Sequence, residues 1–322
     1  MAHALVTGGA GFIGSHLCEE LLSRGEDVIV LDNLSTGSMA NIEHLKDKKG
    51  FTLVVDSVLN KPVIEALVQK ADRIFHLAAA VGVKLIMERP VDTIETNVLG
   101  TEHVLSLANK YHKKVLIAST SEVYGKHRDH TLAEMNNMVM GPTKKRRWAY
   151  ACTKALDEFL SFAYHEEKKL PVVVVRFFNT IGPRQTGQYG MVVPKFIKSA
   201  LLNNPITVFG NGMQSRSFTY VKDAVRAVLM LMEKPEAEGD VFNIGDGREI
   251  TILELAKQIK KMTNSTSEIV FVSYNDAYGK GFEDMERRVP DISKIRKFIG
   301  YKPTVSLEQA LEIIIQSVGY QI

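Results

Sequence analysis

GGAGFIG, residues 8–14, stands between a short β-branched run at residues 4–7 and a helical pattern that continues to residue 23. Glycine permits a tight turn between strand and helix, and it lets backbone amides approach a bound pyrophosphate closely. That pyrophosphate would lie at the positive end of the helix. The segment therefore predicts a strand–turn–helix unit that holds a dinucleotide. The residues predicted to contact the dinucleotide here are Gly8, Gly11, Phe12, Ile13 and Gly14.

An acidic residue follows the next strand candidate, residues 27–31. Asp32 lies about 20 residues beyond the glycines. A carboxylate at this place accepts hydrogen bonds from the two hydroxyls of the adenine ribose and repels a 2′-phosphate. Asn33 follows it, rather than an arginine, so the sequence predicts NAD and not NADP. The residues expected near the adenine, beyond the third strand candidate, are Asp56, Ser57 and Val58.

Short apolar runs and longer helical patterns alternate through the first half of the chain. Further strand candidates are residues 51–55, 73–77, 114–119 and 172–177, each separated from the next by a segment that suits a helix. Repeated alternation of this kind predicts a parallel sheet covered on both faces. The fold class is therefore α/β, a Rossmann-type doubly wound parallel sheet, joined by a smaller, mostly C-terminal α/β substrate-binding lobe.

The pattern loosens after about residue 181, where turn signals become frequent and the elements shorter. Strand candidates at residues 206–209 and 240–244 bracket a helical run at 221–232, and amphipathic helices are expected at 253–263 and 307–318. We therefore predict an NAD-binding Rossmann domain over residues 1–180, with 217–245 returning to it. The second lobe, which binds the substrate, would comprise residues 181–216 and 246–322.

Composition limits the function classes. Hydrophobic residues make up 45% and charged residues 24%, as in globular proteins, and 40 basic against 37 acidic residues give a net charge of only +3. This slight excess argues against nucleic-acid binding. The two cysteines, Cys18 and Cys152, have no metal-ligand spacing, so we expect neither a metal nor a disulfide. With no signal peptide and no membrane-spanning run, the cytoplasm is the expected compartment.

Tyr150 and Lys154 form a YxxxK pair inside AYACTKALDEF, residues 149–159. Their four-residue spacing puts both side chains on one face of the predicted helix. A phenol with a pKa near 10 is a poor base at neutral pH, and a neighbouring ammonium would lower that pKa. The pair becomes specific only together with the glycine-rich segment and with STSEVYG at residues 119–125.

These elements together resemble the extended short-chain dehydrogenase/reductase family of nucleotide-sugar enzymes. The resemblance extends along the whole chain, through GGAGFIG, DNLSTG at 32–37, HLAA at 76–79, Asn97, STSEVYG, YxxxK, RFFNTIGPRQ at 176–185, SRSFTYVKD at 215–223 and DVFNIG at 240–245. It implies an NAD-dependent enzyme that binds a UDP-sugar and forms a homodimer through a helix bundle that includes the Tyr150 helix.

The resemblance also implies roles for particular residues. Thr120 would bond the 4-hydroxyl of the sugar, Tyr150 would be the base, and Lys154 would activate it and hold the nicotinamide ribose. Asn179 and Arg216 would bind the diphosphate, since a guanidinium can bond two oxygens at once. Further cofactor contacts would be Leu77, Ala78 and Ala79, and further substrate contacts Val81, Ser121, Val193, Thr207 and Phe209.

Most enzymes of this kind oxidise carbon 4 of the sugar first, and the fate of the 4-keto intermediate distinguishes them. Glu122 lies two residues after Thr120, where simple 4-epimerases usually carry a small or neutral residue. A carboxylate there indicates acid or base work beyond carbon 4, although a salt bridge at the strand end would also explain it. Dehydratases usually have an Asp-Glu pair at this point, whereas this chain has Ser121-Glu122.

Two further stretches resemble UDP-glucuronate decarboxylases, including UDP-xylose synthases and the decarboxylase of the aminoarabinose pathway. GPTKKRRWAYACTK, residues 141–154, would supply Arg147 as a substrate-binding arginine from a cluster that otherwise resembles a solvated basic loop. AYGKGFEDMERRVPDI, residues 277–292, would carry Tyr278 toward the uridine and Arg288 toward the reacting carbons. We assign Arg288 to charge stabilisation because a guanidinium is a poor acid.

Some positions depart from the decarboxylase pattern. Met191 stands where xylose synthases have an arginine, and Ile86 where the aminoarabinose-type enzyme has a tyrosine. A 4-epimerase of a UDP-hexose or UDP-hexuronate therefore remains the alternative, with UDP-apiose synthesis a further branch and a sensor without turnover a third class. Whether NADH is recycled or released, and which pathway takes the product, is left open by the sequence.

Overall fold

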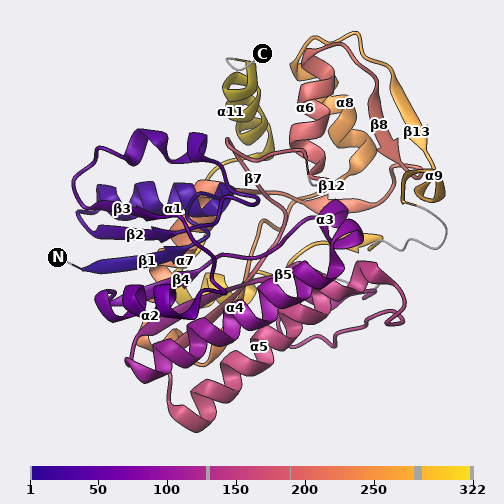
Figure 1. Ribbon diagram of the computed structural model, residues 1–322. Helices are drawn as coiled ribbons and strands as arrows, with labels where there is room; N and C mark the ends of the chain where they lie inside the picture. Colours follow the sequence, from indigo (N-terminus) through magenta and orange to yellow (C-terminus); the bar gives the residue numbers. More distant parts are fainter. Residues whose placement is uncertain (1, 128–130, 189, 279–284, 320–322) are drawn as a thin grey trace.

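A seven-stranded parallel sheet lies at the centre of the computed structural model, which describes residues 2–127, 131–188, 190–278 and 285–319 (Figure 1). The strands run in the order β11-β6-β5-β4-β1-β2-β3, and each neighbouring pair is parallel. Their bounds are β1 (His3–Thr7), β2 (Asp27–Leu31), β3 (Phe51–Val54), β4 (Arg73–His76), β5 (Lys114–Thr120), β6 (Val172–Phe177) and β11 (Asp240–Ile244). This confirms the predicted fold class, with strand ends within one residue of expectation.

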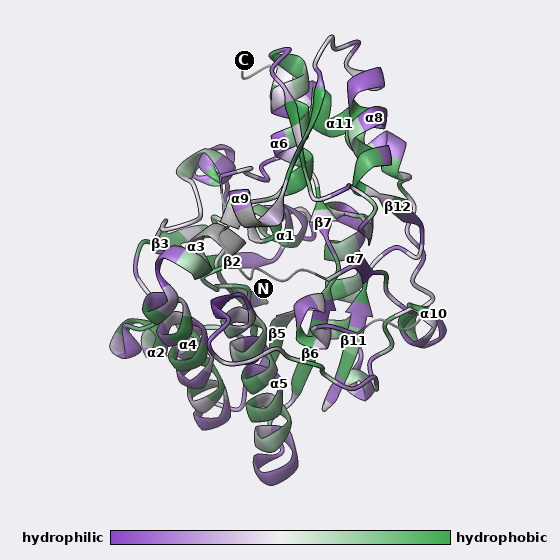
Figure 2. Ribbon diagram, turned by 90° about the vertical axis from the view of Figure 1, so that its right-hand side faces the viewer, coloured by the Kyte–Doolittle hydropathy of each residue, from purple (hydrophilic) through white to green (hydrophobic). Residues whose placement is uncertain are grey.

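Helices cover both faces of this sheet because alternate side chains of each strand point to opposite faces. Val6 belongs to the core that contains Leu17 of one face, while its neighbour Leu5 belongs to the core that contains Val104 of the other. The first face carries α1 (Phe12–Ser23) and α7 (Val221–Met232). The second carries α2 (Lys61–Lys70), α4 (Pro90–Lys110) and α5 (Ala149–Lys168). In Figure 2, the hydrophobic colour of β5 and β6 marks the buried centre.

The second lobe lies on the side of the sheet away from α2, α4 and α5 (Figure 1). Its helices are α6 (Val192–Leu201), α8 (Ile252–Met262), α9 (Tyr274–Tyr278) and α11 (Leu307–Gly319), and β8 (Ile206–Phe209) pairs with β13 (Ile269–Val272). A small sheet has the order β12 (Glu249–Thr251), β9 (Ser215–Ser217), β14 (Arg287–Arg288). The remaining α-helices and strands of the described residues are α3 (Val83–Glu88), α10 (Ser293–Ile299), β7 (Thr180–Ile181) and β10 (Thr219–Tyr220).

The chain returns to the large sheet between these parts. α7 packs against α1, and β11 pairs with β6 at the edge of the sheet, from Asp240↔Val173 to Ile244↔Phe177. Both elements lie within residues 217–245, the stretch for which the sequence predicts this return. We keep the boundaries at 180, 216 and 245 as our proposal for the domain division.

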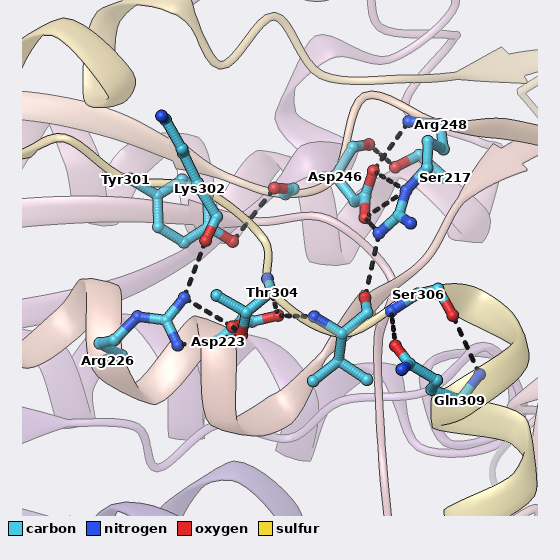
Figure 3. A network of polar contacts seen from close by, with 12 residues as sticks. Ser217, Asp223, Arg226, Asp246, Arg248, Tyr301, Lys302, Thr304, Ser306 and Gln309 are labelled. Atoms are coloured by element: carbon cyan, nitrogen blue, oxygen red, sulfur yellow. Dashed lines mark hydrogen bonds and ion pairs between the residues drawn. The ribbon is translucent and has the colours of Figure 1, made fainter.

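A polar network attaches the C-terminal segment to α7 (Figure 3). The buried Asp223 carboxylate accepts hydrogen bonds from Thr304 N at 2.9 Å, Thr304 Oγ1 at 2.6 Å and Val305 N at 3.1 Å. Arg226 pairs with the same carboxylate at 2.6 Å. Asp223 therefore satisfies the backbone of the segment that leads into α11.

Replacing Asp223 should destabilise the protein. Asp223→Ala would leave the Thr304 and Val305 amides without their acceptor, and we expect a loss of about 2–4 kcal/mol in the free energy of unfolding, measured in urea. Lys46→Ala is the control, because both partners of the Lys46–Glu43 ion pair are exposed and such a pair contributes about 1 kcal/mol or less. Equal losses from the two variants would contradict this interpretation.

Candidate active site

The glycine-rich turn between β1 and α1 borders a cavity of about 1860 Å³. Gly8 has a φ of +75°, and a Cβ there would lie 2.7 Å from Ala78 N. A Cβ on Gly14 would overlap the carbonyl oxygen of Gly8. Gly11, the N-cap of α1, has extended backbone, and no side chain caps the helix. The first turn of α1 therefore offers backbone donors and a helix dipole to an anion in the cavity.

The other predicted cofactor residues line the same cavity. Asp32 is buried at the end of β2, and its carboxylate accepts hydrogen bonds from Ala10 N at 2.9 Å and Leu34 N at 2.8 Å. Burial raises the pKa of Asp32, and these two hydrogen bonds act in the opposite direction. Each oxygen has a further lone pair for a ribose hydroxyl. Also lining the cavity are Phe12, Ile13, Asn33, Asp56, Ser57, Val58, Leu77, Ala78 and Ala79. The Asp32 carboxylate suits the adenine ribose of NAD, and the first turn of α1 suits its pyrophosphate.

The YxxxK residues lie at the beginning of α5, facing the end of β5. Tyr150 and Lys154 are both buried, and Tyr150 hydrogen-bonds with Thr120. Lys154 donates to Asp157 Oδ2 at 2.7 Å. Thr120 also caps the 3₁₀ turn at Ser121–Tyr124, where its hydroxyl accepts from Glu122 N at 3.3 Å. One strand end and one helix start thus bring Thr120, Tyr150 and Glu122 together.

The expected lowering of the tyrosine pKa is wrong for this structure. Burial raises the pKa of Tyr150, the negative charges of Glu122 and Asp157 raise it further, and the bond with Thr120 and the charge of Arg288 only partly oppose them. The ammonium of Lys154 is engaged by Asp157. Tyr150 is therefore a neutral phenol here, and ionising it requires additional positive charge nearby.

Two arginines from distant parts of the chain hold the Glu122 carboxylate. Arg147, at the turn before α5, bonds Glu122 Oε2, and Arg288 of β14 lies 3.3 Å from Glu122 Oε1. Arg288 also donates to Asn179 Oδ1. The basic run at residues 144–147 is therefore not uniformly exposed: Lys144 and Arg146 are exposed, whereas Arg147 is buried. The salt bridge that the sequence allowed for Glu122 exists, at the wall of a cavity.

A second cavity, of about 720 Å³, adjoins the cofactor cavity, and Glu122, Asn179 and Arg288 line both. Arg216 is buried in its wall, although an isolated arginine in such a turn-rich segment would more often be exposed. The predicted substrate residues that line it are Arg147, Asn179, Val193, Thr207, Phe209 and Arg216. Val81 and Ser121 line the larger cavity instead. Tyr278 ends α9, and its side chain lies outside the described residues.

The positions that depart from the decarboxylase pattern lie differently. Met191 lines both cavities, so its exchange for arginine would alter the site directly. Ile86, in α3, is buried and lines neither cavity.

Sequence reasoning missed several residues at the site. Asp157 binds Lys154, and its place one turn further along the helix was the available signal. Arg184 lines the cofactor cavity and donates to Glu19 of α1, whose pKa its charge helps to lower; it lies in GPRQ, which the sequence marks as a turn and as part of the family resemblance, without a role for the arginine. Gln185 lines both cavities and donates to Thr180 O at 2.8 Å.

The described residues contain neither a metal-binding cluster nor a membrane-spanning helix. No group of three or more His, Cys, Asp or Glu side chains there is arranged to hold a metal ion. Within the same ranges, no helix combines the length and the hydropathy needed to span a bilayer.

A sequence profile described as GDP-mannose 4,6 dehydratase matches residues 5–314. The chain belongs to this family of extended short-chain dehydrogenases/reductases. Family membership confirms the resemblance derived from GGAGFIG, STSEVYG and YxxxK.

Similar proteins include decarboxylases and epimerases. The UDP-N-acetyl-alpha-D-glucosaminuronate decarboxylase of Bacillus cytotoxicus is 44% identical over 313 residues, 97% of this chain and 96% of that protein. The UDP-glucuronic acid decarboxylase 1 of Xenopus tropicalis is 38% identical over 307 residues, 95% of this chain and 70% of that protein. The structure of UDP-glucuronic acid 4-epimerase from Bacillus cereus with UDP-glucuronic acid and NAD has a TM-score of 0.90 at 29% identity and covers 99% of this chain and all of its own.

Buried His76, at the end of β4, should make the stability of the protein depend on pH. Its ring bonds the hydroxyls of Thr7 at 2.8 Å and Thr101 at 3.2 Å, and burial together with the charge of Lys154 lowers its pKa to about 3. Below about pH 6.5 the unfolded chain binds a proton at this histidine that the folded protein does not bind. Lowering the pH therefore reduces the free energy of unfolding, by at most about 1.4 kcal/mol per pH unit from this group.

His76→Gln should therefore make the free energy of unfolding depend less steeply on pH between 6.5 and 4, whatever its effect at pH 7. Urea titrations across that range measure the slope. His112→Asn, at an exposed histidine, is the control and should leave the slope nearly unchanged. A His76→Gln slope parallel to that of the wild type would contradict the buried, neutral state.

Proposed function

We propose that the protein is an NAD-dependent decarboxylase of a UDP-hexuronate, acting through a 4-keto intermediate. The arrangement of Glu122 between Arg147 and Arg288, beside Thr120 and Tyr150, carries this proposal. Among the described residues that line this cavity, the cations Arg147, Lys195, Arg216 and Arg288 outnumber the carboxylates Glu88 and Glu122, so the wall carries an excess of positive charge. Such a site favours a second carboxylate, which carbon 6 of a hexuronate supplies and carbon 6 of a hexose does not.

The relatives support this choice. Decarboxylases 36–44% identical to the chain match it over 95–97% of its length. The names of these decarboxylases give two substrates, UDP-glucuronate and UDP-N-acetylglucosaminuronate, and we propose these two as the candidates. The 4-epimerase activity of the structural neighbour, which also acts on a UDP-hexuronate, is the alternative outcome of the test below.

The first step is oxidation at carbon 4. Bound NAD supplies the acceptor for the hydride. Thr120 orients the 4-hydroxyl and Tyr150 removes its proton, for which the phenol must lose its own proton first. Since burial favours the neutral phenol, the positive charge needed to ionise it must come from the loaded site and from Lys154. Asp32 and the first turn of α1 would hold the adenosine and the pyrophosphate.

Loss of carbon dioxide follows because the ketone at carbon 4 makes the hexuronate a β-keto acid. The bond between carbons 5 and 6 breaks, its electron pair passes into the enolate of the ketone, and carbon dioxide leaves uncharged. A proton from solvent water then adds to carbon 5 in place of the lost carboxylate. Arg147 and Arg288 hold the substrate carboxylate in place before the bond breaks, and Glu122 holds both arginines.

The test is incubation of the purified protein and NAD with a panel of UDP-hexoses and UDP-hexuronates, followed by mass spectrometry. Loss of one carbon dioxide from UDP-glucuronate or UDP-N-acetylglucosaminuronate supports the proposal, and NADH absorbance shows whether the cofactor is recycled. An unchanged mass with a changed retention time would instead identify a 4-epimerase.

Glu122→Gln should slow carbon dioxide release by about 100-fold or more while leaving NAD affinity unchanged, because the neutral amide no longer orders the two arginines. Release is measured from carboxyl-labelled substrate, and NAD affinity by calorimetry. Tyr150→Phe is the control, since it should block NADH formation as well. An unaffected rate in Glu122→Gln would contradict the decarboxylation mechanism.

We also propose a homodimer formed through α4 and α5, in the cytoplasm. The two helices pack side by side, and their outer faces expose Leu99 (47%), Leu156 (49%) and Phe159 (62%). Exposed apolar side chains on adjoining helices favour burial against a second copy. Both Cys18 and Cys152 are free thiols, which suits a reducing compartment.

Phe159→Glu should accordingly shift the protein from dimer to monomer in analytical ultracentrifugation, because it would bury a charge in the interface. Phe271→Glu, at another exposed phenylalanine on β13, should have no such effect. A monomeric wild type would contradict the proposed dimer.

A further inference from the structure

The small sheet β12-β9-β14 separates two arginines that are adjacent in the sequence. In its register, Arg287 lies opposite Ser215 of β9, and Arg288 lies opposite Arg216. Because successive side chains of a strand point to opposite faces, the two positions of β14 face opposite sides of the sheet. Arg288 and Arg216 line the substrate cavity, and Arg287 does not.

On the outer face, Arg287 forms a two-point ion pair with Glu249 of β12. Arg287 Nε donates to Glu249 Oε1 at 2.8 Å, and Nη2 donates to Oε2 at 2.7 Å. Ser215, between them on β9, donates to Glu249 as well. These bonds lower the pKa of Glu249, and about a third of each side chain is exposed, 34% in both cases. Paired bonds fix the relative orientation of two planar groups, unlike a single surface contact.

On the inner face, Arg288 contacts Glu122 and Asn179, both of which line the substrate cavity. β14 itself is only two residues long. Its backbone is held by Ser215 N to Glu286 O at 2.9 Å on one side and by Leu132 N to Val289 O at 2.8 Å just after it. The Arg287 ion pair therefore adds the side-chain contact that ties β14 across β9 to β12.

We infer that Glu249 and Arg287 are positioning residues, which set the strand that carries Arg288 so that its guanidinium meets the carboxylate of the substrate. This inference rests on the proposed function. A long arginine side chain reaches a defined place only if its backbone is fixed, and an error of about 1 Å at a reacting group can reduce the rate by about 100-fold. Neither residue contacts the cavity, so both act through Arg288.

The experiment compares Glu249→Ala, Arg287→Ala and the charge-exchanged double variant Glu249→Arg/Arg287→Glu. Each single variant should slow carbon dioxide release from the UDP-hexuronate by about 10- to 100-fold, with the unfolding midpoint in urea unchanged. NADH formation in a single turnover, which reports oxidation at carbon 4, should change much less. The double variant restores the pair across the same face and should recover most of the rate.

The matched control is Arg24→Ala. Arg24 has the same 34% exposure and pairs with Glu20 at 3.0 Å and Glu233 at 2.8 Å, but unlike Arg287 it is not adjacent in the sequence to a residue that lines a cavity. Its loss should leave carbon dioxide release unchanged. Equal rates in Arg287→Ala and the wild type, or a charge-exchanged variant no better than the single variants, would overturn the inference.

A binding measurement separates this inference from the proposed function. In a Tyr150→Phe background, which cannot turn over, Arg287→Ala should weaken binding of UDP-glucuronate by about tenfold and leave binding of UDP unchanged. Equal affinities for UDP-glucuronate with and without Arg287→Ala would overturn the positioning role. If the wild type releases no carbon dioxide from either UDP-hexuronate, the proposed function fails, whereas this binding difference still tests the placement of Arg288.

Discussion

The ion pairs of Glu122 with Arg147 and Arg288 are the constraint on which the site depends. They join three places that are far apart in the chain: the end of β5, the turn before α5, and β14 of the second lobe. A buried carboxylate is costly without partners, and two guanidiniums stabilise it while retaining a positive charge for a further anion. The ion pairs that join the second lobe to the end of β5 thus also place two arginines where the carboxylate of a sugar would bind.

The part of the site that would oxidise carbon 4 differs in charge from the part that would release carbon dioxide. Burial acts on the first part. It keeps Tyr150 a neutral phenol and His76 a neutral imidazole near the Lys154–Asp157 ion pair. The decarboxylating end is ionic. A ligand that brings positive charge to the first end and negative charge to the second suits both, which fits NAD together with a hexuronate.

The sheet could be predicted from sequence because its strands are short apolar runs buried on both faces, as VVVVRF in β6 illustrates. The cofactor turn was predictable too, since Gly8 and Gly14 leave no room for a Cβ. The pairing of Arg287 with Glu249 was not, because it joins residues 38 positions apart through a two-residue strand without a periodic pattern. The raised pKa of Tyr150 was not predictable either, because the YxxxK pattern shows the lysine but neither the burial of the phenol nor the carboxylates around it.

The central claim is that oxidation at carbon 4 leads to cleavage of the bond between carbons 5 and 6. A single turnover of UDP-glucuronate and of UDP-N-acetylglucosaminuronate, each deuterated at carbon 4 and labelled with carbon-13 at carbon 6, tests it most directly. We predict, for at least one of them, that the carbon-13 leaves as carbon dioxide while the deuterium passes to NAD and then either returns to carbon 4 or remains in released NADH. Carbon-13 retained in both products, with deuterium on the opposite face of carbon 4, would contradict the account.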